Sequence, residues 1–114
     1  MATKDTTCAR LAARQLEAYN RRDIDGFAAC YADDVEVRDL ATGDVKMSGI
    51  ATLRERYGAM FASTPDLRAS VDRRIVCGEF AFDHETGQKG GVPFEVVAIY
   101  QAKAGKIAKV WFAR

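Results

Sequence analysis

Residues 24–40 read IDGFAACYADDVEVRDL, and the spacing of apolar side chains changes within this stretch. The first part follows helical spacing, with apolar side chains at Ile24, Phe27, Ala28 and Tyr31. Residues 35–38 then alternate between apolar and polar side chains, which is typical of a strand, and Asp39 falls on the face of the two valines. Between these parts lie Asp33 and Asp34. Carboxylates oppose the dipole at a helix C-terminus, so the pair is expected to end the helix.

Two longer helices are predicted on either side of this stretch. The first covers residues 5–20, and its apolar face carries Cys8, Leu11, Ala12, Leu16 and Tyr19. Gln15 falls on the same face, where an amide must find a partner or border a cavity. Ser48 is the expected N-cap of the other helix, whose apolar side chains are Ile50, Leu53, Tyr57, Met60 and Phe61. Thr64-Pro65-Asp66 ends that helix, because the residue before a proline avoids helical geometry.

The remaining segments predict strands. They cover residues 45–47, 67–77, 79–85, 92–102 and 107–114. Glycine-containing turns separate the last three strands. Three helices on one face of a curved antiparallel sheet make an α+β fold. A chain of 114 residues has the size of one domain, so residues 1–114 are expected to form a single one.

The composition is that of a globular protein: 48% of residues are hydrophobic, 29% are charged, and the formal net charge is +1. Nucleic-acid binders usually carry a concentrated basic surface, which this balance does not support. No apolar run approaches the ~20 residues that span a bilayer. Residues 1–5 are polar, and no signal-peptide core follows them. We therefore expect a cytoplasmic protein with no nucleic-acid or membrane partner.

The three cysteines, Cys8, Cys30 and Cys77, are widely spaced and form no C-x-x-C pair. Their odd number and their spacing argue against a disulfide framework or a structural zinc site. His84 is the only histidine in the sequence, and one histidine with scattered carboxylates is not a metal cluster. We expect mostly buried thiols, and neither a metal ion nor a cofactor.

Several of these motifs resemble those of ketosteroid isomerases and, more widely, of the SnoaL-like group of the nuclear transport factor 2-like superfamily. The similar residues begin within residues 16–39, with Asn20, Asp23, Asp25-Gly26-Phe27, Tyr31-Ala32-Asp33-Asp34 and Val35-x-Val37-x-Asp39. They continue in Gly49-Ile50 to Tyr57 and in Ala104-Gly105-Lys106-Ile107, so the resemblance covers most of the chain. It implies a cone-shaped sheet wrapped around three helices, with a deep apolar pocket inside the cone. It also implies a homodimer packed through the outer face of the sheet.

The resemblance assigns roles to particular residues. Asp39 matches the general base of ketosteroid isomerases, and Tyr31 and Tyr57 match tyrosines that support the oxyanion site in some members. The two oxyanion donors of the family do not carry over: the tyrosine position is occupied by Gln15, and the position of the protonated aspartate falls near Val97. Loss of one such donor typically costs ~10²–10³ in turnover. Steroid isomerase activity is therefore expected to be weak or absent.

Asp39 and Gln15 each allow two interpretations. On a strand that faces the pocket, desolvation would raise the pKa of Asp39 and make it an acid or base near neutral pH. Alternatively, Asp39 caps the turn at Thr42-Gly43. Gln15 either donates an amide N–H to a substrate oxygen or is a core glutamine that the backbone satisfies.

Aromatic residues on the predicted inner faces are candidate pocket residues. Tyr19, Tyr31 and Tyr57 either belong to the core or place their hydroxyls at the edge of a cavity. The other aromatic candidates are Phe61, Phe82 and Phe112.

His84 follows Phe80 and Phe82 on one strand face. It either points to the mouth of the cone, where it would pair with Asp39, or is exposed at the end of a hairpin. Trp111 and Phe112 are neighbours on a strand, so one of them lies on the outer face and suggests a partner surface. Phe94 and Tyr100 share strand parity and are candidates for that same surface.

These patterns favour a cofactor-free enzyme that moves a proton on a small hydrophobic carbonyl compound. In this interpretation Asp39 removes a proton α to the carbonyl group. Gln15, a tyrosine hydroxyl or an ordered water polarises the carbonyl oxygen. The alternative is a non-catalytic domain that binds a small molecule or acts as a dimeric interaction domain. The absent donors favour the alternative, whereas a buried, ionisable Asp39 would favour the enzyme.

Overall fold

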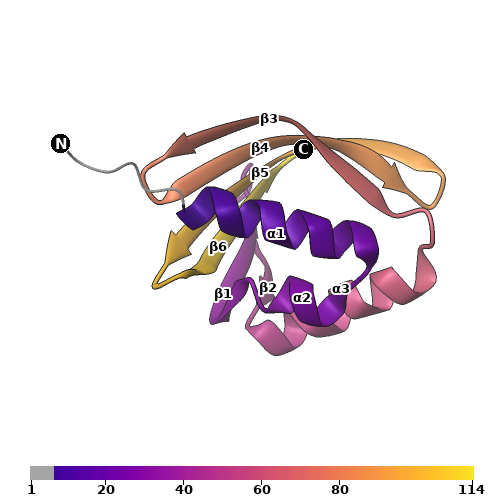
Figure 1. The fold of residues 1–114 in the computed structure, drawn as a ribbon, viewed down its shortest axis with the longest axis horizontal. Helices are drawn as coiled ribbons and strands as arrows, with labels where there is room; N and C mark the ends of the chain where they lie inside the picture. The colour runs from indigo at the N-terminus through magenta and orange to yellow at the C-terminus, as the bar shows by residue number, and fades with distance from the viewer. Residues whose placement is uncertain (1–6) are drawn as a thin grey trace.

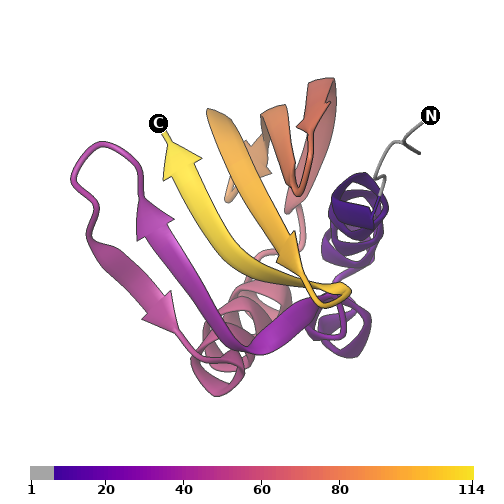
Figure 2. The same cartoon turned by 90° about the vertical axis from the view of Figure 1, so that its left-hand side faces the viewer.

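The computed structural model describes residues 7–114, which form three helices and one six-stranded sheet. Their order is α1 (Thr7–Arg21), α2 (Ile24–Ala28), β1 (Tyr31–Asp39), β2 (Val45–Ser48), α3 (Ile50–Ser63), β3 (Arg68–Cys77), β4 (Phe80–Lys89), β5 (Val92–Lys103) and β6 (Lys106–Ala113). The helices lie on one side of a curved sheet (Figures 1 and 2). This arrangement confirms the α+β prediction. The predicted start of the first helix, at residues 5 and 6, lies outside the described residues.

The strand order is β2-β1-β6-β5-β4-β3. Every neighbouring pair is antiparallel except β1 and β6, which run parallel, so the prediction of a wholly antiparallel sheet is wrong at this pair. The two strands lie far apart in the chain, and no short hairpin fixes their relative direction. Backbone bonds from Ile107 to Cys30 and from Leu40 to Phe112, both 2.9 Å, mark the two ends of the parallel pair.

Pairing with β6 also changes the end of the second helix. Asp23 caps this helix by accepting the Gly26 N–H at 3.0 Å, but α2 already ends at Ala28. The spacing of apolar residues placed Tyr31 in the helix, and this prediction is wrong. Tyr31 instead pairs with Ile107 of β6 and is the first residue of β1. The acidic pair at residues 33–34 therefore lies within a strand. A sheet partner distant in sequence has overridden the local pattern.

The third helix starts without the predicted side-chain cap. Ser48 is the last residue of β2, and the N-cap is Gly49, with a φ of 88°. Its N–H donates to the carbonyl oxygen of Val35 at 2.7 Å, which ties the start of α3 to β1. Glycine adopts this left-handed conformation without the steric cost that a Cβ would add.

The hairpin between β4 and β5 is tighter than predicted. β4 continues to Lys89, and only Gly90 and Gly91 form the turn. Both turn N–H groups donate to the carboxylate of Asp66, at 2.9 and 2.6 Å. Gly87 is required inside β4, because a Cβ there would collide with the carbonyl oxygen of Arg68 and with the ring of Phe94.

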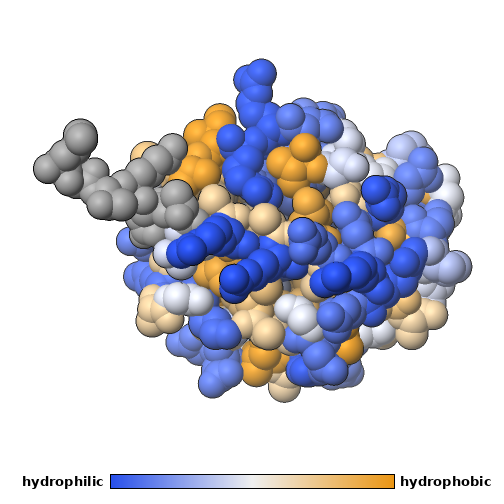
Figure 3. Space-filling view, viewed as in Figure 1, coloured by the Kyte–Doolittle hydropathy of each residue, from blue (hydrophilic) through white to orange (hydrophobic). Residues whose placement is uncertain are grey.

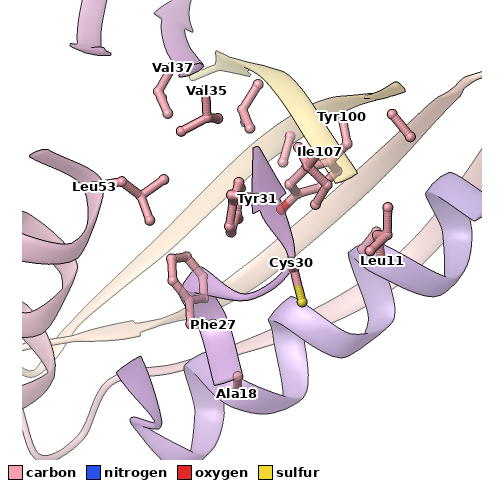
Figure 4. Close-up of a cluster of buried hydrophobic side chains, with 14 of the residues drawn as sticks. Leu11, Ala18, Phe27, Cys30, Tyr31, Val35, Val37, Leu53, Tyr100 and Ile107 are labelled. Atoms are coloured by element: carbon pink, nitrogen blue, oxygen red, sulfur yellow. The ribbon is translucent and has the colours of Figure 1, made fainter. Parts of the chain in front are cut away.

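The core lies between the helices and the inner face of the sheet (Figure 4). Phe27 of α2 is at its centre, with ring centroids 4.6 Å from Tyr57, 5.0 Å from Tyr31 and 5.6 Å from Phe61. Polar side chains of α1 face away from this core, and the surface over α1 is mostly hydrophilic (Figure 3). Within residues 7–114, no helix has the length and apolar character needed to cross a membrane.

Candidate functional site

A cavity of about 460 Å³ lies next to the aromatic core. Helices α1, α2 and α3 and the strands of the sheet all contribute to its wall. Much of the wall is apolar, including Leu16, Met47, Met60, Phe94 and Val96. Of the described residues, the wall also contains nine polar or charged side chains: Gln15, Tyr19, Tyr31, Arg56, Tyr57, Glu85, Lys89, Tyr100 and Arg114. Pockets of this size and character are typical of small-molecule sites.

A chain of hydrogen bonds runs along one wall of the cavity. The Tyr31 hydroxyl donates to Oε1 of Gln15 at 3.0 Å, and Nε2 of Gln15 donates to the Tyr100 hydroxyl at 3.0 Å. The Tyr100 hydroxyl donates in turn to Oε2 of Glu85 at 3.3 Å. Tyr31 and Tyr100 come from β1 and β5 and lie on the same side of the sheet as the core (Figure 4). The chain therefore ends at a carboxylate, which is the strongest acceptor in it.

Glu85 carries the carboxyl group of the cavity wall, and its pKa is strongly perturbed. Its exposed fraction is 7%, and burial raises its pKa to about 7, with a further contribution from the charge of Asp83. The hydrogen bond from Tyr100 and the charge of Arg74 act in the opposite direction but do not cancel the burial. Near neutral pH this carboxyl group therefore exists in both protonation states, as a general acid or base requires.

Asp83 lies two residues earlier on the same face of β4. It is fully buried and forms a two-pronged ion pair with Arg74, at 2.7 and 2.9 Å. A guanidinium that bonds both carboxylate oxygens is one of the strongest hydrogen-bonded partners that a buried carboxylate can have. The two acids thus differ in their partners: Asp83 is paired with a guanidinium, whereas Glu85 accepts a hydrogen bond from the hydroxyl of Tyr100.

The tyrosines of the cavity remain protonated. Burial raises the pKa of Tyr19 to about 12 and raises the pKa values of Tyr31, Tyr57 and Tyr100 further. Within residues 7–114, no protein group forms a hydrogen bond with the hydroxyl of Tyr19 or Tyr57, and no fully buried side-chain polar atom lacks a partner. Both hydroxyls are therefore accessible from the cavity and free to donate to a ligand.

Asp39 does not line this cavity. Its Oδ1 accepts the backbone N–H of Thr42 at 3.1 Å, in the turn after β1. That bond lowers the pKa of Asp39. The expected rise in its pKa is therefore wrong, and the alternative of a turn-capping aspartate is confirmed. The catalytic role that the resemblance implies for Asp39 stays a prediction, which is tested below against Glu85.

Other predicted pocket residues from the helices and from β1 are found near the cavity. Gln15, Tyr19, Tyr31, Tyr57 and Phe112 line it, whereas Phe61 packs behind Tyr19 in the core with ring centroids 5.6 Å apart. Gln15 is buried, and its two N–H groups donate to Tyr100 and to the carbonyl oxygen of Ala12. Its amide is therefore engaged within the protein and positions Tyr100.

The predicted residues of β4 and β5 lie on the other face of the sheet. Phe82 and Val97 are partly exposed and do not line the cavity, and His84 pairs with Glu95 at 2.6 Å near the surface. His84 is therefore partly exposed and does not point to the mouth of the cone, but it lies in the middle of β4 and not at the end of a hairpin. Conversely, Phe94 and Tyr100 were expected on a partner surface but line the cavity. The parity within each strand was correct, but the choice of the inner face was not.

Sequence reasoning missed Glu85, Asp83 and Tyr100. The two acids alternate with Phe80 and Phe82, and the phenylalanines suggested that their own face was the buried one. A usable signal was Ala81, which shares the face of Asp83 and Glu85 and is completely buried. A small residue is suited to a site where helices approach a sheet closely.

Among residues 7–114, no three His, Cys, Asp or Glu side chains are grouped so that they could hold a metal ion. Cys8 and Cys30 are buried, and Cys77 is exposed.

Comparisons with known structures place this fold among cystatin-like proteins. An uncharacterised cystatin-fold protein from Novosphingobium aromaticivorans is 26% identical, with a TM-score of 0.87 over 98% of this chain and 100% of that chain. A candidate ketosteroid isomerase from Kribbella flavida is 23% identical, with a TM-score of 0.78 over 94% of this chain and 76% of that one. A candidate polyketide cyclase from Sinorhizobium meliloti is 20% identical, with a TM-score of 0.73 over 91% and 94% of the two chains. The last two similarities show the fold alone.

Comparison with protein families gives a more specific result. No curated protein matches this sequence. The family model of the SnoaL-like domain, however, matches residues 12–110, which include the cavity-lining segments of all three helices and most of the sheet. The chain belongs to the SnoaL-like domain family.

Proposed function

We propose that this protein is a cofactor-free enzyme that transfers a proton on a small hydrophobic carbonyl compound, with Glu85 as the acid–base group. The observation that carries the proposal is a buried carboxyl group, with its pKa raised to about 7, in the wall of an aromatic cavity. An ordinary exposed glutamate is fully ionised near neutral pH and is a weak base. Glu85 is matched to proton transfer at the pH at which most enzymes operate.

The chemical step uses groups from both sides of the cavity. The Glu85 carboxylate removes a proton from the carbon α to the carbonyl group, and the electron pair moves onto the carbonyl oxygen. The free hydroxyls of Tyr19 and Tyr57 donate to that oxygen as it becomes negative. In a compound with a β,γ double bond, the resulting enolate is conjugated with that bond. Glu85, now a neutral acid, then returns the proton to the γ-carbon, as the electron pair moves back from the oxygen and the double bond shifts into conjugation with the carbonyl group. The product is an isomer, and the enzyme ends in its starting state.

The hydrogen-bond chain supports this step by fixing the base. Tyr100 holds Oε2 of Glu85, Gln15 holds the hydroxyl of Tyr100, and Tyr31 holds the amide oxygen of Gln15. Residues that are locked by their own partners keep a reactive group in place with little loss of entropy during the reaction. Asp83 contributes through its charge, which raises the pKa of Glu85 and makes it a stronger base.

Proton exchange tests this proposal without a known substrate. A panel of cyclic ketones, including a β,γ-unsaturated ketosteroid, is incubated with the protein in D₂O, and deuterium uptake is measured by mass spectrometry. We expect uptake at the α-carbon of at least one ketone, and loss of that uptake in Glu85→Gln. A wild-type rate equal to that of Glu85→Gln for every ketone would contradict the proposal.

A second candidate is a binding domain without catalysis. The observation that favours it is the environment of Gln15 and Val97, the positions that correspond to the oxyanion donors of ketosteroid isomerases. The amide N–H groups of Gln15 are engaged within the protein, and Val97 lies outside the cavity. In this case ketones would bind without proton exchange, and Glu85→Gln would leave their affinity within about threefold, a change that corresponds to less than one hydrogen bond.

We also propose that the protein is a homodimer through the outer face of the sheet. Four apolar side chains form an uninterrupted row across neighbouring strands: Ile75, Phe82, Ile99 and Trp111. Ile75 is 57% exposed, and Phe80 adds a ring beside Phe82 and Trp111. The pairs Arg38–Glu36 and His84–Glu95 lie near this outer apolar row. A second copy therefore offers complementary polar groups as well as an apolar surface.

Light scattering at micromolar concentration tests the dimer. We expect a mass of two 12.5 kDa chains for the wild type and of one chain for Trp111→Asp. Val45→Asp is the matched control, because Val45 is an exposed apolar residue at the edge strand β2 and lies outside the row. A wild-type mass of one chain would overturn the dimer.

A further inference from the structure

The charged side chains around the cavity are unbalanced. Of residues 7–114, its wall includes three cationic side chains, Arg56, Lys89 and Arg114, and one carboxyl group, that of Glu85. The whole chain, by contrast, has a formal net charge of only +1. The cations come from three different elements: α3, the end of β4 and the segment after β6. Residues that are distant in the sequence therefore place their positive charges at the same cavity.

None of these three cations is neutralised by a carboxylate of the described residues. The ion pairs within residues 7–114 involve other arginines and His84. Arg56 donates to the carbonyl oxygen of Lys46 at 2.6 Å, and the guanidinium of Arg114 lies 5.3 Å from the ring centroid of Phe112. Asp66, near Lys89 at the same hairpin, uses both carboxylate oxygens for the N–H groups of the turn and does not line the cavity.

The positive charge reaches into the cavity. Although burial dominates and raises the pKa values of Tyr19 and Tyr57, the charge of Arg114 partly offsets that rise in both. The excess of positive side chains in the cavity wall does not depend on Arg114 alone, since Arg56 and Lys89 already outnumber Glu85. All three cations are exposed side chains, whereas Glu85 is buried, so the positive charge is at the rim and the acid–base group is deeper.

We infer that the ligand of this cavity is an amphipathic anion, with an apolar body that fills the aromatic part and an acidic group held at the rim by Arg56, Lys89 and Arg114. This inference names the substrate class of the site in the proposed function and rests on the use of that cavity. A carboxylate or sulfonate at one end of the compound would leave its other end facing Glu85. The rim charges would also raise the encounter rate of anions over neutral compounds of the same shape.

Two dyes with the same ring skeleton test the inference. The anion 1-anilinonaphthalene-8-sulfonate carries an acidic group that the neutral N-phenyl-1-naphthylamine lacks, and both fluoresce more strongly in apolar sites. We expect the anion to bind about tenfold more tightly in low salt, as the sum of several partly exposed ion pairs. The preference should shrink in 1 M salt, where charges are screened beyond ~3 Å.

Single substitutions then locate the binding. Arg56→Gln, Lys89→Gln and Arg114→Gln should each weaken the anion by about threefold, as expected for one exposed pair, and leave the neutral dye within twofold. Arg38→Gln is the control, because Arg38 lies beside Trp111 on the outer face of the sheet. Glu85→Gln should not weaken the anionic dye, since it removes a negative charge. The same variant loses turnover if the proposed function holds, so the two hypotheses are tested separately.

Three outcomes would overturn the inference. The neutral dye could bind as tightly as the anion, which would leave the cavity and its proton transfer intact but remove the role of the rim. Arg38→Gln could weaken the anion while the rim variants do not, which would place the dye on the outer face. The third outcome is that neither dye binds, which would show that the cavity does not accept an apolar anion.

Discussion

The turn after β1 and the middle of β4 each hold one carboxyl group, and these two regions perturb it in opposite directions. Asp39 accepts a backbone N–H in the turn, which lowers its pKa. Glu85 faces the cavity, where burial and the charge of Asp83 raise its pKa to about 7. The residue that matches the family's base is thus a weak base in this structure. The residue that no motif indicated has the environment of a strong one.

The largest expected effect is on turnover. With any ketone that exchanges its α-proton, Glu85→Gln should lower kcat by about 10²–10⁴, the usual contribution of a general base. Asp39→Asn should change kcat less than about threefold, because its carboxylate only caps a turn. The rate of deuterium uptake is measured for both variants side by side with the same ketone. If Asp39→Asn has the larger effect, the comparison is reversed and the role implied by the resemblance is correct.

The next effect concerns the support of Glu85. Arg74→Met leaves Asp83 as a buried carboxylate without its partner, and should lower the free energy of unfolding by about 3–5 kcal/mol. Arg38→Met is the matched control: it breaks the partly exposed pair with Glu36, which is worth less than about 1 kcal/mol. Urea denaturation followed by circular dichroism measures both. Equal losses would mean that burial of Asp83 is not what makes its ion pair important.

A third effect is the pH dependence of stability. The pKa of Glu85 is higher in the folded protein than the 4.5 of an unperturbed glutamate, so the folded state binds the proton more tightly. Stability should therefore fall as the pH rises from about 4.5 to about 7, by up to about 3 kcal/mol. Above this window Glu85→Gln should be more stable than the wild type. The free energy of unfolding of this variant should no longer fall with pH between these two values.

Asp39 provides the opposite sign in the same experiment. Its pKa is lowered in the folded protein, so its stabilising contribution is present above its ordinary value of 3.8 and is lost as the pH falls below it. Asp39→Asn should remove only that acidic part of the curve. Thermal unfolding at half-unit pH intervals resolves the two windows, and a curve for Glu85→Gln that still falls between pH 4.5 and 7 would show that another group titrates there.

The smallest effect separates two tyrosines. Tyr100→Phe removes a hydrogen bond that stabilises the Glu85 carboxylate, so the pKa of Glu85 should rise and the pH midpoint of kcat should move up by about one unit. Tyr57→Phe removes no bond to Glu85 and should lower kcat without moving the midpoint. A pH profile of each variant distinguishes positioning of the base from stabilisation of the substrate oxygen.

Much of the framework could be predicted from the sequence. Helical spacing predicted α1 and α3, and alternation predicted the strands, because each element must bury one side regardless of its partners. The apolar face of α1 also placed Gln15 and Tyr19 correctly, since a helix has one core-facing stripe and its members are fixed by the period. The resemblance added the curvature of the sheet around the helices.

The acid–base group of the site was decided by tertiary structure. Alternation along β4 divides its residues into two sets with certainty, one with Phe80 and Phe82 and the other with Asp83 and Glu85. It does not say which set faces inward, because that depends on what covers each side of the sheet. The acids lie inside because Arg74 and Tyr100, from neighbouring strands, satisfy them there. The phenylalanines lie outside, in the row that we propose a second copy covers. The sequence alone determined the periods, and only the assembled sheet determined which face became the site.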